Sequence, residues 1–131
     1  MVTGFMKLNG TTVGAVANRT AVFGDDGEIA EKFDAVLSPR GAKKAAEFVK
    51  FCDAFNIPVL TLTNVKGFLA TKCSEHNIAK AVASLTYAFA DATVPKVNVI
   101  IGEAFGSAYV AMNSKSIGAD MVYAWPEAKV G

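Results

Sequence analysis

The sequence is poor in the side chains that build metal centres and disulfide frameworks. It holds a single histidine, His76, and two cysteines, Cys52 and Cys73, which do not form a CxxC pair. One histidine and two separated thiols are too few ligands for an ordinary zinc site, so we expect no metal. We interpret both cysteines as reduced thiols, which is typical of a cytoplasmic protein.

The sequence also lacks an excess of charge of one sign and any long apolar run. The net charge of +1 argues against non-specific binding to nucleic acid. No apolar run reaches the roughly 18 residues of a membrane span, and no N-terminal segment combines a basic start, an apolar stretch and a cleavage site. We therefore expect contact with a membrane only through partner proteins.

Apolar residues, in contrast, are abundant. They make up 52 % of the 131 residues, which is above the usual share of a water-soluble domain. The sequence shows no repeat, low-complexity tract or internal linker, so residues 1–131 are predicted to form a single domain with a sizeable core. The apolar surface left over after folding favours association with other chains, including copies of this one.

The N-terminal part is predicted to contain a hairpin, a loop and a helix. Residues 5–18 are typical of two strands joined at Asn9-Gly10, a favoured hairpin turn. Residues 19–29, with the turn Asp25-Asp26-Gly27, are predicted to be a loop. A helix is expected from Ser38-Pro39 to about Phe55, because serine caps helices and proline suits their first turn. Its predicted core face, at helical spacing, consists of Ala42, Ala45, Ala46, Val49 and Cys52.

Strands and helices alternate in the rest of the chain. Strands are expected at 59–63, 94–101 and 120–124, and helices at about 74–91 and 105–114, with a loop at 64–70. This alternation implies right-handed crossovers and a mostly parallel α/β sheet.

Two of these strands end in glycine-containing turns. We call residues 65–68 (Val65-Lys66-Gly67-Phe68) the first elbow and residues 104–108 (Ala104-Phe105-Gly106-Ser107-Ala108) the second elbow. In parallel sheets, sites form outside the carboxyl ends of the strands, where free backbone N–H groups of helix starts also lie. One donor from each elbow would make a two-pronged oxyanion hole, although phosphate binding and tight packing are alternatives.

Side-chain chemistry at the elbows has weaker support. Gly106-Ser107-Ala108 is not the Gly-x-Ser-x-Gly nucleophile elbow, and His76 is the only candidate base of the usual kind. Neither elbow matches a phosphate-binding Walker loop or a dinucleotide fingerprint. Lys66 and Lys72 flank the first elbow and are candidates to meet an anionic ligand, whereas Lys43 and Lys44 are interpreted as a solvated helix face.

Three stretches in the same order resemble a known family. They are "FCDAFNIPVLTLTNVKGF", "YAFADATVPKVNVIIGEAFGSAYVAMNSK" and "ADMVYAWPEAKVG", which cover 51–68, 87–115 and 119–131. They resemble the C-terminal half of the carboxyltransferase subunit of biotin-dependent acyl-CoA carboxylases and decarboxylases. The resemblance extends over nearly the whole chain.

The resemblance implies a crotonase-like α/β fold (the ClpP/crotonase fold) built from repeated ββα units with a mostly parallel sheet. It implies that this chain holds biotin delivered by a biotin carboxyl carrier protein, while an N-terminal carboxyltransferase domain, absent here, holds the acyl-CoA substrate. The implied reaction moves a carboxyl group between biotin and the acyl-CoA.

The same resemblance assigns roles to residues of both elbows. Backbone donors for the charge that develops on biotin are implied at Gly67 and Phe68 and at Ser107 and Ala108. Residues implied to line the biotin site are Lys66, Gly106 and Tyr109.

The chain departs from the family pattern at these positions. Family members usually carry Gly-Gly-Ala-Tyr where this chain has Gly106-Ser107-Ala108-Tyr109, and Pro-Gly-Phe-Leu-Pro-Gly where it has residues 66–71. Two further hypotheses therefore stay open. One is a non-catalytic assembly module of such a complex. The other is a small crotonase-like enzyme acting alone, for which Glu103 is the one carboxylate near the elbows.

Overall fold

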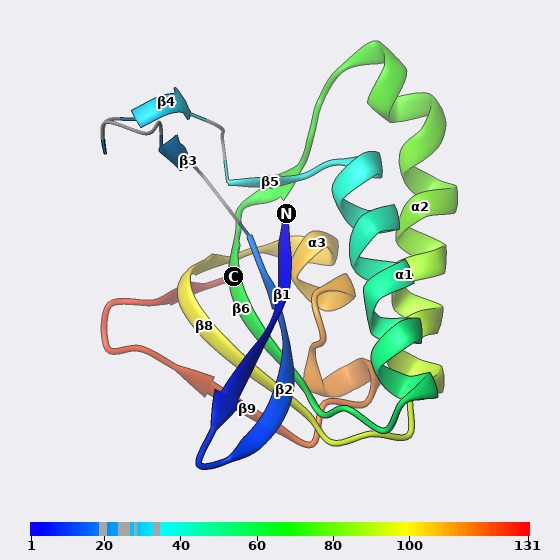
Figure 1. The fold of residues 1–131 in the computed structure, drawn as a ribbon. Coiled ribbons are helices and arrows are strands. Elements are labelled where there is room, and N and C mark those ends of the chain that lie inside the picture. The colour runs from blue at the N-terminus through cyan, green and yellow to red at the C-terminus, as the bar shows by residue number, and fades with distance from the viewer. Residues whose placement is uncertain (19–20, 24–26, 28, 33–34) are drawn as a thin grey trace.

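A computed structural model of the chain describes residues 1–18, 21–23, 27, 29–32 and 35–131. Within these residues a six-stranded sheet is the largest element, with strands in the order β1-β2-β6-β8-β10 and β9 also paired with β8. Only β1 and β2 pair antiparallel in this sheet, so the mostly parallel α/β architecture is confirmed. Helices α1, α2 and α3 lie on one side of the sheet (Figure 1).

The N-terminal hairpin forms as the sequence predicts. Strands β1 (Val2–Leu8) and β2 (Thr11–Ala17) are joined at Asn9 and Gly10, which both have positive φ, 51° and 81°. Positive φ at both central residues is the requirement of a type I′ turn, and asparagine and glycine adopt it most readily. Strand β2 then pairs parallel with β6 and so attaches the hairpin to the rest of the sheet.

Helix α1 (Pro39–Ala54) begins at the predicted cap. Ser38 Oγ accepts a hydrogen bond from the N–H of Gly41 at 3.0 Å. All five residues of the predicted core face are buried, and Cys52 is inaccessible to solvent. The cap and the apolar stripe together explain why this segment is helical.

Helix α2 and strand β6 agree with the predictions, apart from their ends. Helix α2 (Lys72–Asp91) begins two residues earlier than expected, because the Thr71 hydroxyl caps the N–H of Ser74 at 3.1 Å. Strand β6 (Val59–Val65) and strand β8 (Lys96–Ala104) are parallel neighbours in the centre of the sheet.

The last helix is shorter than predicted. Helix α3 spans Gly106–Ala111 and is followed by the 3₁₀ turn η1 (Lys115–Ile117) and strand β9 (Met121–Ala124). Asn113 has a φ of 58°, a conformation that ends a helix and that asparagine tolerates better than most residues. The predicted helix to residue 114 was therefore wrong by one turn.

Several short strands were not predicted. Strands β3 (Ala21–Phe23) and β4 (Ile29–Lys32) pair antiparallel, so the predicted loop at 19–29 was wrong for part of its length, and Asp25 and Asp26 lie outside the described residues. Strand β5 (Val36–Leu37) pairs parallel with β7 (Gly67–Phe68), and β10 (Lys129–Val130) pairs parallel with β8. Strands of two residues are too short to show an apolar alternation.

The core lies between the helices and the sheet. Its largest fully buried side chains include Phe89 and Leu85 of α2, Leu37 of β5 and Met112 after α3. None of the helices within the described residues is both long and apolar enough to cross a membrane.

Candidate functional site

The two elbows lie beside each other because their strands are neighbours. Val65 at the end of β6 pairs with Ala104 at the end of β8. Immediately beyond this pair, the N–H of Phe105 donates to the carbonyl oxygen of Val65 at 3.1 Å. Helix α3 also packs against β7, which follows β6. The first and second elbows therefore meet at one edge of the sheet, as the sequence predicts for the carboxyl ends of parallel strands.

The second elbow exposes backbone donors at the start of α3. Gly106 has a φ of 63°, and its N–H is already used by the carbonyl oxygen of Gly131 at 2.9 Å. The N–H groups of Ser107 and Ala108 have no acceptor among the described residues, because they lie in the first turn of the helix and its N-cap residue, Phe105, provides no side-chain cap. Ser107 is exposed and Ala108 is buried. Two unpaired donors thus remain where the resemblance implies them.

The first elbow is attached to strand β5 by backbone hydrogen bonds. The N–H of Lys66 donates to the carbonyl oxygen of Ala35 at 2.7 Å, and the N–H of Leu69 donates to that of Leu37 at 3.0 Å. A Cβ atom placed on Gly67 would meet nothing within 4 Å, and the same holds for Gly106. Both glycines thus border open space, into which a ligand can approach the backbone.

A widening of the sheet precedes the elbows and is filled by Asn64. The β6–β8 register shifts after the pair Thr63–Ile100, so that the strands next pair at Val65–Ala104. Asn64 Oδ1 accepts from the N–H of Glu103 at 3.1 Å. This contact was not predicted, because Asn64 was expected in the loop 64–70 and a single asparagine gives no signal of a bulge.

Buried polar side chains connect α3 with the sheet beneath it. Thr63 Oγ1 donates to Asn98 Oδ1 at 2.6 Å, and Asn98 Nδ2 donates to the carbonyl oxygen of Met112 at 3.2 Å. Asn113 Nδ2 donates to Thr61 Oγ1 at 3.1 Å. These bonds attach the C-terminal end of α3 to β6 and β8, so the start of the helix is held in a defined place.

The remaining predicted residues differ in their surroundings. Phe68 and Tyr109 are half-buried and pack against the core cluster, while Lys66 is exposed. The Ser107 hydroxyl has no hydrogen bond to His76, which is exposed on α2, among the contacts of the described residues. Such a bond would be expected of a serine nucleophile and its base.

Clear pKa shifts occur away from the elbows. Burial raises the pKa of the Cys52 thiol. Hydrogen bonds from Thr93 lower the pKa of Asp53, and they outweigh the partial desolvation of this carboxylate, which by itself would raise the pKa. Both residues belong to the last turns of α1. No group of three or more histidine, cysteine or acidic side chains suited to a metal ion occurs within the part of the chain that the structure describes. The elbows therefore offer backbone dipoles as their main chemical resource.

Comparisons with known proteins agree on one family. The family model described as "Carboxyl transferase domain" matches residues 1–131. A putative propionyl-CoA carboxylase beta chain of Bacillus subtilis is 47 % identical over 99 % of this chain, and the methylmalonyl-CoA carboxyltransferase 12S subunit of Propionibacterium freudenreichii is 42 % identical over 99 %. The match covers 24 % and 23 % of those proteins, so the chain spans about a quarter of their length.

A solved structure supports the same grouping. The crystal structure of transcarboxylase 12S, described as a hexamer assembly with methylmalonyl-coenzyme A and methylmalonic acid bound, superimposes with a TM-score of 0.86. It is 42 % identical to this chain, and the match covers 98 % of this chain and 24 % of that one. A shared fold and a shared sequence at this level argue for common descent along the whole of residues 1–131.

Proposed function

This chain belongs to the carboxyl transferase domain family and has the crotonase-like α/β fold, and from this premise we propose that it is the biotin-side part of a carboxyltransferase. The proposed reaction moves a carboxyl group between biotin and an acyl-CoA. The relatives' names, propionyl-CoA carboxylase and methylmalonyl-CoA carboxyltransferase, support a short acyl-CoA as the substrate. Residues 1–131 are proposed to act as a single C-terminal-type domain.

The observation that carries this proposal is the meeting of the two elbows, the second of which has unpaired backbone donors. The hydrogen bond from Phe105 to Val65 holds the elbows together, and the N–H groups of Ser107 and Ala108 remain free. Donors that are fixed in advance stabilise a developing negative charge without reorganisation, and one such donor is commonly worth about 10²–10³ in rate.

The residues present fit biotin. Its ureido oxygen needs N–H donors and close approach to the backbone, and both elbows provide a glycine that borders open space. When bound, biotin supplies the ureido nitrogen that carries the carboxyl group. The chain's own part is to bind and orient the ring: Gly67 and Phe68 from one side, Ser107 and Ala108 from the other, with Lys66, Gly106 and Tyr109 around them.

The proposal includes partner proteins. A biotin carboxyl carrier protein would deliver the cofactor, and an N-terminal carboxyltransferase domain would hold the acyl-CoA opposite the elbows. In the two relatives named above, most of the protein lies outside the segment that matches this chain, which leaves room there for an acyl-CoA-binding domain. Assembly with further copies of the chain is proposed as well, in keeping with the hexamer described for transcarboxylase 12S.

The proposal is tested by removing one backbone donor. Ser107→Pro deletes an N–H within the first turn of α3, where proline is tolerated, and Ser107→Ala keeps it. In an assembly of this chain with the complementary carboxyltransferase sequence, we expect Ser107→Pro to lower kcat for carboxyl transfer from methylmalonyl-CoA to biotin by about 10²-fold or more. Ser107→Ala should change it by less than about threefold.

A second variant guards against misfolding. Gly67→Ala adds one methyl group that meets no atom of this chain, so the thermal unfolding temperature should not fall. The methyl group would nevertheless crowd the proposed biotin ring and raise KM for biotin. If both Ser107→Pro and Gly67→Ala fold and transfer carboxyl groups at the wild-type rate, the two elbows do not hold biotin and the proposed function of this chain is wrong.

A further inference from the structure

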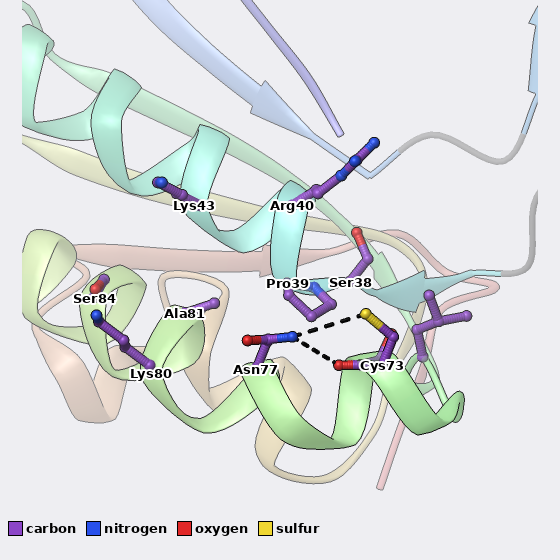
Figure 2. Close-up of a pocket in the computed structure, with 11 residues that line it drawn as sticks. Ser38, Pro39, Arg40, Lys43, Cys73, Asn77, Lys80, Ala81 and Ser84 are labelled. Atoms are coloured by element: carbon purple, nitrogen blue, oxygen red, sulfur yellow. Dashed lines mark hydrogen bonds between the residues drawn. The ribbon is translucent and has the colours of Figure 1, made fainter.

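A groove between the N-terminal halves of α1 and α2 has no role in the proposed reaction. Its volume is about 680 Å³, which is within the usual range for a small-molecule site. Figure 2 shows that Arg40 and Lys43 come from α1, whereas Asn77 and Lys80 come from α2. Leu69, just beyond the first elbow, closes part of the wall.

The groove lies where α2 has few buried apolar side chains, because α2 buries its apolar side chains mainly in its second half. The buried contact residues of α2 include Leu85, Ala88 and Phe89, in its second half. Nearer its start, the face that lines the groove carries Asn77, Lys80, Ala81 and Ser84 at helical spacing.

The groove is electropositive and its charges are unpaired. Arg40, Lys43 and Lys80 make no hydrogen bond or ion pair with any residue that the structure describes. Among the described residues, none that line the groove is acidic. By contrast, Lys44 beside it donates to the carbonyl oxygen of Met1 at 3.2 Å. Lys43 is exposed, as expected of a solvated helix face, and it also lines this groove.

We propose that this groove binds the phosphate groups of a nucleotide-sized ligand. Arginine binds phosphate oxygens in a bidentate manner, and lysine contributes a point charge and up to three donors. The hydroxyl groups of Ser38 and Ser84 add neutral donors, since Ser38 Oγ accepts from Gly41 and keeps its own proton to give. Three cations and this volume suit a diphosphate better than a single phosphate ion, and a diphosphate occurs both in coenzyme A and as the free ion.

Cys73 provides a direct reporter, because it lines the groove and is exposed whereas Cys52 is inaccessible. Alkylation of Cys73 by iodoacetamide, a neutral reagent, would be followed by mass spectrometry on the 131-residue chain. Diphosphate and acetyl-coenzyme A, whose acylated sulfur does not consume the reagent, are added in separate titrations, with sodium chloride at matched ionic strength as the control. We expect both phosphate compounds to slow the alkylation at millimolar concentrations or below, and sodium chloride to have no comparable effect.

Variants show whether the protection comes from the groove. In the double variant Lys43→Gln/Lys80→Gln, the concentration of diphosphate that halves the rate of Cys73 alkylation should rise about tenfold or more, because two charge-assisted contacts are lost. The control Lys7→Gln/Lys50→Gln removes the same charge from residues outside the groove and should shift it by less than about twofold. Protection at lower concentrations by acetyl-coenzyme A than by diphosphate identifies a nucleotide ligand, and equal protection identifies the diphosphate group alone.

Three results would overturn the proposal. One is the absence of protection by either compound up to roughly 10 mM at low ionic strength, because a specific phosphate site should bind more tightly than that. Another is protection that survives unchanged in Lys43→Gln/Lys80→Gln. The third is equal protection by sodium chloride, which would show that the effect is general screening of the charges by salt and not binding in the groove.

Discussion

At the scale of single residues, small side chains near the elbows have different reasons to be small. Gly67 and Gly106 border open space, so their size matters to a ligand rather than to this chain. Gly102 is different, because a Cβ atom there would lie 2.6 Å from Asn64 Oδ1. Asn64 in turn holds the N–H of Glu103, so Gly102 is small in order to admit the amide that fills the sheet's widening.

Gly102→Ala is therefore expected to destabilise the fold by displacing Asn64. The lost hydrogen bond and the unsatisfied N–H of Glu103 together correspond to about 1–2 kcal/mol in the free energy of unfolding. In the Asn64→Ala background the same substitution has no amide to displace, and its cost should fall to less than about 0.5 kcal/mol. A double-mutant cycle by urea denaturation measures this coupling, and additive effects of the two substitutions would show that Gly102 is small for another reason.

At the scale of elements, buried polar side chains decide where the helices end. Lys96 begins strand β8 but is 4 % exposed, and its Nζ donates to the carbonyl oxygens of Phe89 at 2.6 Å and Ala92 at 2.9 Å. These are among the last carbonyls of α2, which have no partner within the helix. A buried ammonium group at this end is also attracted by the negative end of the helix dipole and so stabilises the end of α2.

Lys96→Met keeps the length of the side chain and removes its donors. Because two carbonyl oxygens would remain buried without a partner, the free energy of unfolding should fall by about 2 kcal/mol or more. Lys50→Met, at an exposed position of α1, should change it by less than about 0.5 kcal/mol. Equal stabilities of the two variants in denaturant titrations would mean that water replaces the lysine at no cost.

The elements also differ in how far the sequence predicts them. Helix α1 was predicted almost to the residue, since its serine cap, proline and apolar stripe act locally. Helix α3 was overestimated, because the turn at Asn113 is fixed by bonds to Thr61 and Val97 that lie far away in sequence. The pairing of β5 with β7 was missed for the same reason: two-residue strands exist only through their partners.

At the scale of the whole molecule, the meeting of the elbows was predictable and their detailed bonding was not. Parallel neighbours bring their carboxyl ends together whatever the side chains are, so the alternating pattern was sufficient. The use of the Gly106 N–H by Gly131 depends on strand β10, which has no sequence signal of its own. The groove of cations was also hidden, because Arg40, Lys43 and Lys80 come together only through the packing of α1 on α2.

A single carboxylate ties the far ends of these packed helices together. Asp53 in the last turn of α1 accepts hydrogen bonds from the N–H of Thr93 at 2.8 Å and from its hydroxyl at 3.0 Å, in the connection between α2 and β8. The N–H of Thr93 is the main cause of the lowered pKa of Asp53. Because the ionised form is favoured in the folded state, protonation of Asp53 must weaken the whole fold.

The pH dependence of global stability follows from this sign. The folded pKa of Asp53 lies below its ordinary value of 3.8, so its contribution is fully present above that value and is lost as the pH falls through the folded pKa. We expect Asp53→Asn to lower the free energy of unfolding by about 0.5–1 kcal/mol at pH 7, a modest amount because the carboxylate is partly exposed. The difference in the free energy of unfolding between wild type and variant should narrow once the pH falls below about 4.

Urea titrations from pH 7 to pH 3 test this dependence. The control is Asp91→Asn, because the hydrogen bonds of the described residues include none to the side chain of Asp91. A gap that stays constant over this range would show that the Asp53–Thr93 bonds do not depend on the charge and would remove the proposed link between the helices' far ends.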